Sequence, residues 1–217
     1  MIRPLFASAA LVALVGAQAS ATNLLNNAGF EDALGFDFAN PNNWNGFFGG
    51  PAGTFLQAFN DTGATPRSGD RALVTTIRGA EGITTGNDAF TGHVQIVNGI
   101  TAGASYELAV WARTNPLLLN GAEFRVEWQD AMGVEISRFN QPLQGLVTSD
   151  YQRFAFTDVA PAGASRAAIV IAVQSFIGAS PADTSVAWDD ASFQIIPAPG
   201  AAALLAVAGV TGLRRRR

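Results

Sequence analysis

The amino-acid sequence predicts an all-β protein, a jelly-roll β-sandwich of about eight to ten antiparallel strands. Three observations predict this fold. Apolar and polar residues alternate along short segments, clusters of Gly, Pro, Asn, Asp and Ser separate these segments, and helical periodicity is almost absent between the two ends of the chain. We expect an N-terminal signal helix and a C-terminal apolar helix to flank the sandwich.

The N-terminus has the layout of a cleaved export signal. Arg3 precedes an apolar stretch over 5–16, and Ala19, Ser20 and Ala21 supply the small residues that a signal peptidase reads. We therefore predict a signal peptide over 1–21 with cleavage after Ala21. The alternative is an uncleaved N-terminal anchor.

The candidate strands follow one another between the two ends of the chain. Each shows period-two alternation or a short β-branched and aromatic run. Turn signals separate them at 68–70, 101–103, 130–133 and 161–163. The predicted strands are 54–59, 71–77, 93–97, 105–113, 123–129, 134–138, 152–157, 167–173 and 186–195.

Alternation along two of these strands assigns their faces. The side chains that we assign to the core are Tyr106, Leu108, Val110 and Ala112 on one strand and Ala122, Phe124, Val126 and Trp128 on the next. The opposite faces carry Glu107, Trp111 and Arg113, and Glu123, Arg125 and Glu127. Because Trp111 lies on a polar face, it is a candidate stacking platform for a sugar ring. The alternative is that a loop or the N-terminal segment covers it.

Composition and charge exclude several classes of protein. Without the two end segments, residues 22–196 form one predicted domain with 17 acidic and 8 basic residues, a net charge of −9. This charge argues against nucleic acid as a partner. The chain has no cysteine and only one histidine, which excludes disulfides and zinc sites of the His/Cys type. We expect that histidine, His93, to lie on a strand surface with no catalytic role.

The C-terminal segment 197–217 combines a Pro-Ala-Pro-Gly start, an apolar run over 201–213 and four terminal arginines. As a helix the apolar run would rise about 20 Å, short of the roughly 30 Å hydrocarbon core of a bilayer. The arginines would be held on the cytoplasmic side, which leaves residues before Pro197 outside. The segment therefore predicts outward-facing cargo directed to a membrane.

This tail resembles the PEP-CTERM sorting signal of Gram-negative bacteria, which an exosortase recognises and removes. The matching residues are Pro197, Pro199, Arg214, Arg215, Arg216 and Arg217, with Ala198 in place of the family's Glu. The resemblance implies transient membrane anchoring and then release to the cell surface or extracellular matrix. The alternatives are an ordinary C-terminal helix and a permanent tail anchor.

The middle of the chain is similar to carbohydrate-binding modules with a galactose-binding-like jelly roll. The similarity runs from about residue 23 to 196 and is carried by 23–31, Trp44, 67–72, 99–113, 127–133 and 188–193. It implies a glycan or exopolysaccharide as ligand. The residues that we expect to contact it are Trp111, Trp44, Arg113 and Glu107, although most aromatic residues between 44 and 59 are better explained as core packing.

The same resemblance implies a structural Ca²⁺ that ties the first strand to the last. By position its ligands are Glu31, Asp189 and Asp190, with oxygens from Ser68 and Asp70 of the 68–70 turn. Calcium binds six to eight hard oxygen atoms, which suits this set. If alternation continues through Ala187, Ala191 and Phe193, Asp189 points inward and needs a counter-charge. The alternative is a hydrogen-bonded or Arg-paired carboxylate.

Together these patterns predict a sorted surface or matrix protein, exported across the inner membrane, that binds a glycan without catalysis. Its partners in export would be signal peptidase and exosortase. A structural matrix protein with no sugar binding is the first alternative. A glycoside hydrolase is the second, because Glu123 and Glu127 lie on one strand face and could form a carboxylate pair, although solvated strands carry such glutamates routinely.

Overall fold

The computed structural model describes residues 22–32, 41–50, 55–61, 65–78, 89–114, 121–175 and 184–197. Both predicted flanking helices lie outside these residues, as do Ala19, Ala21, Ala198, Pro199 and 214–217. Within the described ranges there is no helix that could cross a membrane. Pro197 follows the last strand without regular structure.

The regular elements of the described residues are all strands, in two antiparallel five-stranded sheets, which confirms the all-β sandwich prediction. One sheet, here called the β7 sheet, has the order β1-β4-β9-β6-β7, and the other, the β8 sheet, has the order β2-β3-β10-β5-β8. The strands are β1 (Asn45–Gly49), β2 (Phe55–Asp61), β3 (Ala72–Arg78), β4 (Ala89–Asn98), β5 (Ser105–Thr114), β6 (Gly121–Gln129), β7 (Glu135–Pro142), β8 (Gln152–Val159), β9 (Arg166–Ser175) and β10 (Thr184–Ile196).

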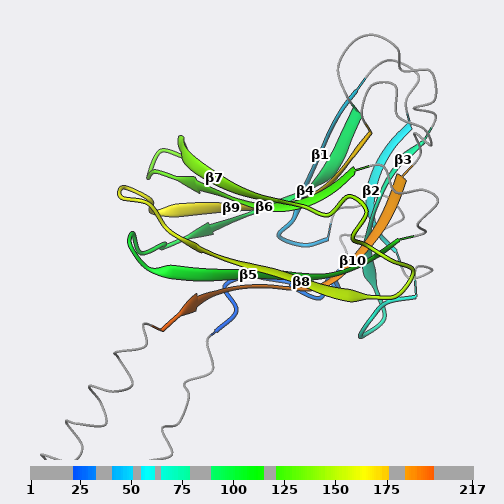
Figure 1. Ribbon diagram of the computed structural model, residues 1–217, viewed down its shortest axis with the longest axis horizontal. Helices are drawn as coiled ribbons and strands as arrows, with labels where there is room; N and C mark the ends of the chain where they lie inside the picture. Colours follow the sequence, from blue (N-terminus) through cyan, green and yellow to red (C-terminus); the bar gives the residue numbers. More distant parts are fainter. Residues whose placement is uncertain are drawn as a thin grey trace, which may run out of the picture. The chain divides into compact units, whose positions relative to one another are not determined.

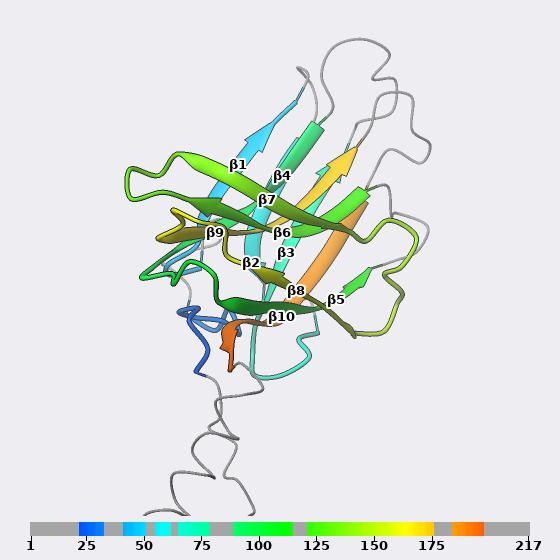
Figure 2. The same cartoon turned by 60° about the vertical axis from the view of Figure 1, so that its left-hand side comes forward.

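The sheets lie face to face, with β7, β6 and β9 above β5 and β8 in Figure 1. Strands far apart in sequence are neighbours: β4 pairs with β9, and β10 lies between β3 and β5 (Figure 2). The last strand of the chain is therefore the central strand of its sheet.

The core lies between the sheets and is built from the predicted inward faces of β5 and β6. Tyr106 stacks on Phe193 with ring centroids 5.1 Å apart, and Trp128 lies 5.5 Å from Tyr106. The buried indole of Trp128 donates to Asp158 Oδ2 at 2.7 Å, so its polar edge is satisfied as burial requires. The face assignments made from alternation are confirmed on both strands.

Two sequence-based placements are wrong. His93 is fully buried, because β4 is paired on both sides, with β1 and β9, and His93 lies on its inner face between Thr91 and Gln95. Burial lowers the pKa of His93 to about 4. Asp189 does not point into the core: it pairs in register with Trp111 on the outer face, and a bulge between Asp189 and Ser192 then shifts the alternation.

Candidate functional site

Trp111 lies on the outer face of the β8 sheet, as predicted, but a neighbouring segment covers it. The guanidinium carbon of Arg67 stands 3.8 Å above the centre of the indole. Arg67 also forms an ion pair with Asp190 of β10. The cation–π contact and the ion pair together hold Arg67 over the ring, so a ligand could stack on that face of Trp111 only after Arg67 moved.

The other predicted ligand-binding residues make contacts within the protein. Glu107 accepts a hydrogen bond from Arg153 at 2.5 Å, and Arg113 lies 5.2 Å from the ring of Tyr151. Trp44 is buried against Phe30, and its Nε1 donates to a backbone carbonyl at 3.2 Å. Trp44 is therefore a core residue, and its prediction as a stacking platform is wrong because its ring has no solvent-facing side.

The five predicted calcium ligands gather at one turn. Asp189 Oδ2 accepts the backbone N–H groups of Arg67 and Ser68 at 2.7 and 3.1 Å, and its Oδ1 accepts that of Asp190 at 2.7 Å. Burial is the main cause that raises the pKa of the Asp189 carboxyl, and these backbone donors oppose it. Glu31 accepts the N–H of Asp70 at 2.9 Å.

Protein donors therefore face these carboxylates, which is the alternative arrangement that the sequence left open. Ser68 Oγ donates to the carboxylate of Asp190 at 2.9 Å, and Arg67 pairs with the same group. Among the described residues, no group of three or more His, Asp or Glu side chains is arranged to hold a metal ion. Calcium binding at this turn stays a prediction.

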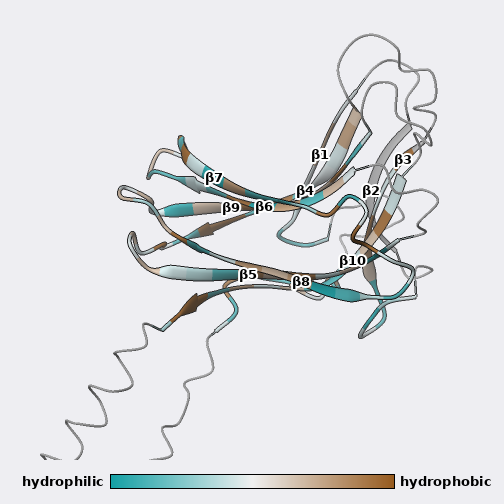
Figure 3. Cartoon of the chain, viewed as in Figure 1, coloured by the Kyte–Doolittle hydropathy of each residue, from teal (hydrophilic) through white to brown (hydrophobic). Residues whose placement is uncertain are grey.

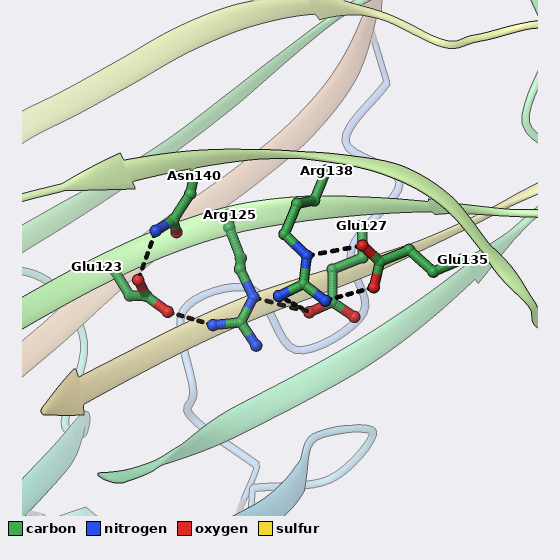
Figure 4. A network of polar contacts seen from close by, with 6 residues as sticks. All are labelled: Glu123, Arg125, Glu127, Glu135, Arg138 and Asn140. Atoms are coloured by element: carbon green, nitrogen blue, oxygen red, sulfur yellow. Dashed lines mark hydrogen bonds and ion pairs between the residues drawn. The ribbon is translucent and has the colours of Figure 1, made fainter. Parts of the chain in front are cut away.

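The outer face of the β7 sheet carries a connected set of ion pairs, here called the β6–β7 network (Figure 4). Arg125 lies between Glu123 and Glu127 and pairs with both; its Nε donates to Glu127 Oε1 at 2.7 Å. Across the ladder, Asn140 Nδ2 donates to Glu123 Oε2 at 2.7 Å, and Arg138 Nη1 lies 3.6 Å from Glu127 Oε1. The members are Glu123, Arg125, Glu127, Glu135, Arg138 and Asn140.

The network has a buried part and an open part. The side chain of Glu123 is 7% exposed, whereas that of Arg138 is 49% exposed. A hydrogen bond from Arg138 lowers the pKa of the Glu135 carboxyl, and the same bond raises the pKa of the Arg138 guanidinium. Three carboxylates and two guanidinium groups leave one net negative charge, and the solvated members retain free hydrogen-bonding capacity.

Small side chains separate this network from an aromatic pair on the same face. In register across the sheet, Phe47 of β1 is followed by Gly92, Ala172 and then Glu123. The ring of Phe47 lies 6.2 Å from that of Phe90, which is 40% exposed. With strands about 4.8 Å apart, the strip between Phe47 and Glu123 spans roughly 14 Å, and its two small residues, Gly92 and Ala172, are buried.

Gly92 is required in this strip for a physical reason. A Cβ added to it would stand 2.3 Å from the carbonyl oxygen of Ile171 on β9, so no larger residue fits while the strands keep their spacing. Sequence reasoning did not identify this face as a binding site. The alternating charges of β6 were the available signal, and their partners on β7 became visible only with the strand register.

Comparison with known proteins gives the fold but no family. Neither a protein family nor a curated protein matches the sequence. A cyclase from Fischerella sp. TAU matches with a TM-score of 0.57 and 14% identity over 82% of this chain and 99% of the cyclase. The enzymatically active domain of tailspike protein 4 of bacteriophage CBA120 matches with a TM-score of 0.57 and 19% identity over 80% of this chain.

An arabinose-bound α-L-arabinofuranosidase matches with a TM-score of 0.52 and 14% identity over 80% of this chain. The chain spans 21% of the tailspike chain and 26% of the arabinofuranosidase chain. Carbohydrate-binding modules also match, among them a xylan-binding module at a TM-score of 0.49 and a module in complex with galactotriose at 0.48. At these identities the likenesses to the cyclase, the tailspike and the arabinofuranosidase show the β-sandwich fold alone.

Proposed function

We propose that this chain is an exported, non-catalytic glycan-binding protein of the cell surface or extracellular matrix, and that its ligand lies on the outer face of the β7 sheet. One observation carries the proposal: the partly exposed ring of Phe90 stands on one side of this face and the exposed Arg138 of the β6–β7 network on the other, with the buried Gly92 and Ala172 between them. The sequence resemblance to carbohydrate-binding modules supports the same ligand class.

The chemistry of this face suits a neutral sugar chain. A sugar ring presents C–H groups on its faces and hydroxyl groups around its edge. Phe90 offers a flat apolar surface to the C–H groups. The side chains of Glu127, Glu135 and Arg138 offer hydrogen-bond acceptors and donors to the hydroxyl groups. A short stretch of polysaccharide could span the roughly 14 Å from the aromatic rings to the network.

The network argues for binding and against hydrolysis. A glycosidase needs one carboxyl group that holds a proton for the leaving group and a second carboxylate for the other face of the sugar. Arg125 stands between Glu123 and Glu127 and donates to both, so its guanidinium occupies the space between the two carboxylates where a sugar would have to lie. The pair is therefore better suited to fixing the position of Arg125 than to acid catalysis.

Export and sorting rest on the two ends of the sequence. The signal over 1–21 would be removed by signal peptidase, and the tail over 197–217 would be recognised by an exosortase while it holds the chain at the membrane. Mass spectrometry of the secreted product tests this. We expect peptides that begin at Thr22 and none that contain Arg217; a secreted product that retains Arg217 would refute processing of the tail.

Glycan-array binding followed by calorimetry tests the ligand-binding face. We expect Arg138→Ala and Phe90→Ala each to weaken binding by roughly tenfold or more, because both remove contacts without touching the core. Trp111→Ala, on the other sheet, is the matched control and should bind normally. Loss of binding in the Trp111 variant alone would move the site to the β8 sheet. No binding by the wild type to any glycan would favour a purely structural matrix protein.

A further inference from the structure

Several large apolar side chains are exposed at one end of the sandwich. Met132 is 83% exposed and Val134 is 58% exposed, both in the tight turn between β6 and β7. Ile136, Val159 and Ile195 are also exposed. We call these five residues the apolar end. Single exposed apolar residues are ordinary on protein surfaces, but several at one end mark an interaction surface.

Backbone hydrogen bonds show that these residues come from one end of the fold. Ser165, in the turn between β8 and β9, donates to Gln129 O at 3.0 Å beside the β6–β7 turn. Ala160 donates to Ala104 O at 3.0 Å, which joins the β8–β9 turn to the β4–β5 turn. Ser105 then pairs with both Val159 and Ile196. The three turns and the end of β10 lie together in Figure 1.

The C-terminal tail leaves the sandwich from this same end. Strand β10 ends at Ile196, and the end of this strand is coloured as strongly hydrophobic in Figure 3. Only residues 197–200 separate Ile196 from the apolar run that begins at Ala201. Four residues span at most about 14 Å when fully extended. If the apolar run enters a bilayer, the end of the sandwich is therefore held within about 14 Å of it.

We propose that the apolar end rests on the membrane surface into which the tail inserts, with the β6–β7 turn in the headgroup region. The proposal depends on the proposed function in one respect, the insertion of the tail. The turn suits this contact because the carboxylate of Asp130, which lies in the turn, is hydrogen-bonded within the protein. Its Oδ1 accepts the N–H groups of Met132 and Val134, each at 2.9 Å. The guanidinium of Arg166 lies beside Gly133, where it can meet lipid phosphate.

The absence of cysteine from the chain makes the contact measurable at single positions. Met132→Cys and Leu146→Cys would each carry the only thiol of the full chain, labelled with an environment-sensitive fluorophore. Leu146 is the matched control because it is apolar and 52% exposed. It lies beyond Leu143, which bonds to Ala122 at the other end of β6, about 23 Å from Gln129.

The experiment mixes each labelled chain with vesicles of phosphatidylethanolamine and phosphatidylglycerol that contain headgroup-proximal nitroxide lipid. We expect the chain to float with the vesicles and the label at position 132 to be quenched roughly twofold or more, with little change at position 146. Flotation with equal quenching at both positions would overturn the membrane contact while leaving tail insertion intact. Absence of flotation would overturn both. A change at position 132 without vesicles would assign the surface to a second copy of the chain and overturn the lipid contact.

Discussion

The buried histidine predicts a measurable loss of stability on mild acidification. His93 has a folded-state pKa of about 4, lowered by burial, against 6.5 when unfolded. Between these values the unfolded chain binds a proton at this residue and the folded chain does not. Stability therefore falls as the pH drops from about 7 to about 4, and this contribution levels off below that. The pKa difference corresponds to about 3 kcal/mol.

The variant His93→Gln isolates this effect, because glutamine does not titrate. The carboxylates titrate alike in both proteins and cancel when the two are compared. Urea unfolding followed by tryptophan fluorescence at pH 7, 6, 5 and 4 gives the free energy of unfolding for each. We expect the free energy of unfolding of the wild type, relative to that of the variant, to fall by about 3 kcal/mol from pH 7 to pH 4.

His93 is the only histidine in the chain, so its ring protons in an NMR spectrum give the folded-state pKa directly. A titration midpoint near 6.5, or parallel stability curves for wild type and His93→Gln, would refute the reasoning. Either result would mean that the ring meets water or an acidic partner in the folded state.

Three further predictions concern the turn at 68–70 and the network. Gly69→Ala should destabilise the fold by about 2 to 4 kcal/mol in urea unfolding, because Gly69 has φ +62° and an added Cβ would stand 2.0 Å from Glu31 Oε1. Gly99→Ala, at φ +79° with open space around it, should cost only about 1 kcal/mol. If both variants lost the same stability, contact with Glu31 would not explain the effect at Gly69. Calcium bound by Glu31, Asp189 and Asp190 predicts that EDTA lowers Tm and that Asp189→Asn abolishes the difference; an unchanged Tm would mean that the backbone donors suffice. Glu123→Ala should cost about 1 to 3 kcal/mol, because it leaves Asn140 without its acceptor and Arg125 with Glu127 alone; a cost no greater than that of Glu135→Ala, at the exposed edge, would contradict this.

The sequence predicted most of the fold because alternation and turn chemistry are local signals. Strand β1 was missed, since Asn-Gly-Phe-Phe-Gly contains two glycines and no alternation; it forms because it pairs with β4. The bulge in β10 was also missed, because the positive φ of Asp190 leaves no mark in the residue pattern. His93 was misplaced because its burial follows from the pairing of β4 with both β1 and β9, which only the strand order reveals.

The candidate site was harder to predict than the fold. Trp44 and Trp111 are both tryptophans, and only their packing shows that the ring of Trp44 is buried whereas that of Trp111 is covered by Arg67. The charges of Glu123, Arg125 and Glu127 were visible in sequence. Their function depends on Arg138 and Asn140, and the β6–β7 register sets which residue faces which. Long-range pairing of this kind is not encoded in any short window of the sequence.

The order of the strands also bears on when the protein can fold. β10 is the last strand to be synthesised, yet it fills the centre of its sheet between β3 and β5. Asn23, near the start of the described chain, likewise bonds to Ala191 and Phe193 of β10. Until residue 196 has been synthesised, β3 and β5 lack β10, their shared neighbour. The β8 sheet therefore cannot be completed until synthesis has reached the end of β10.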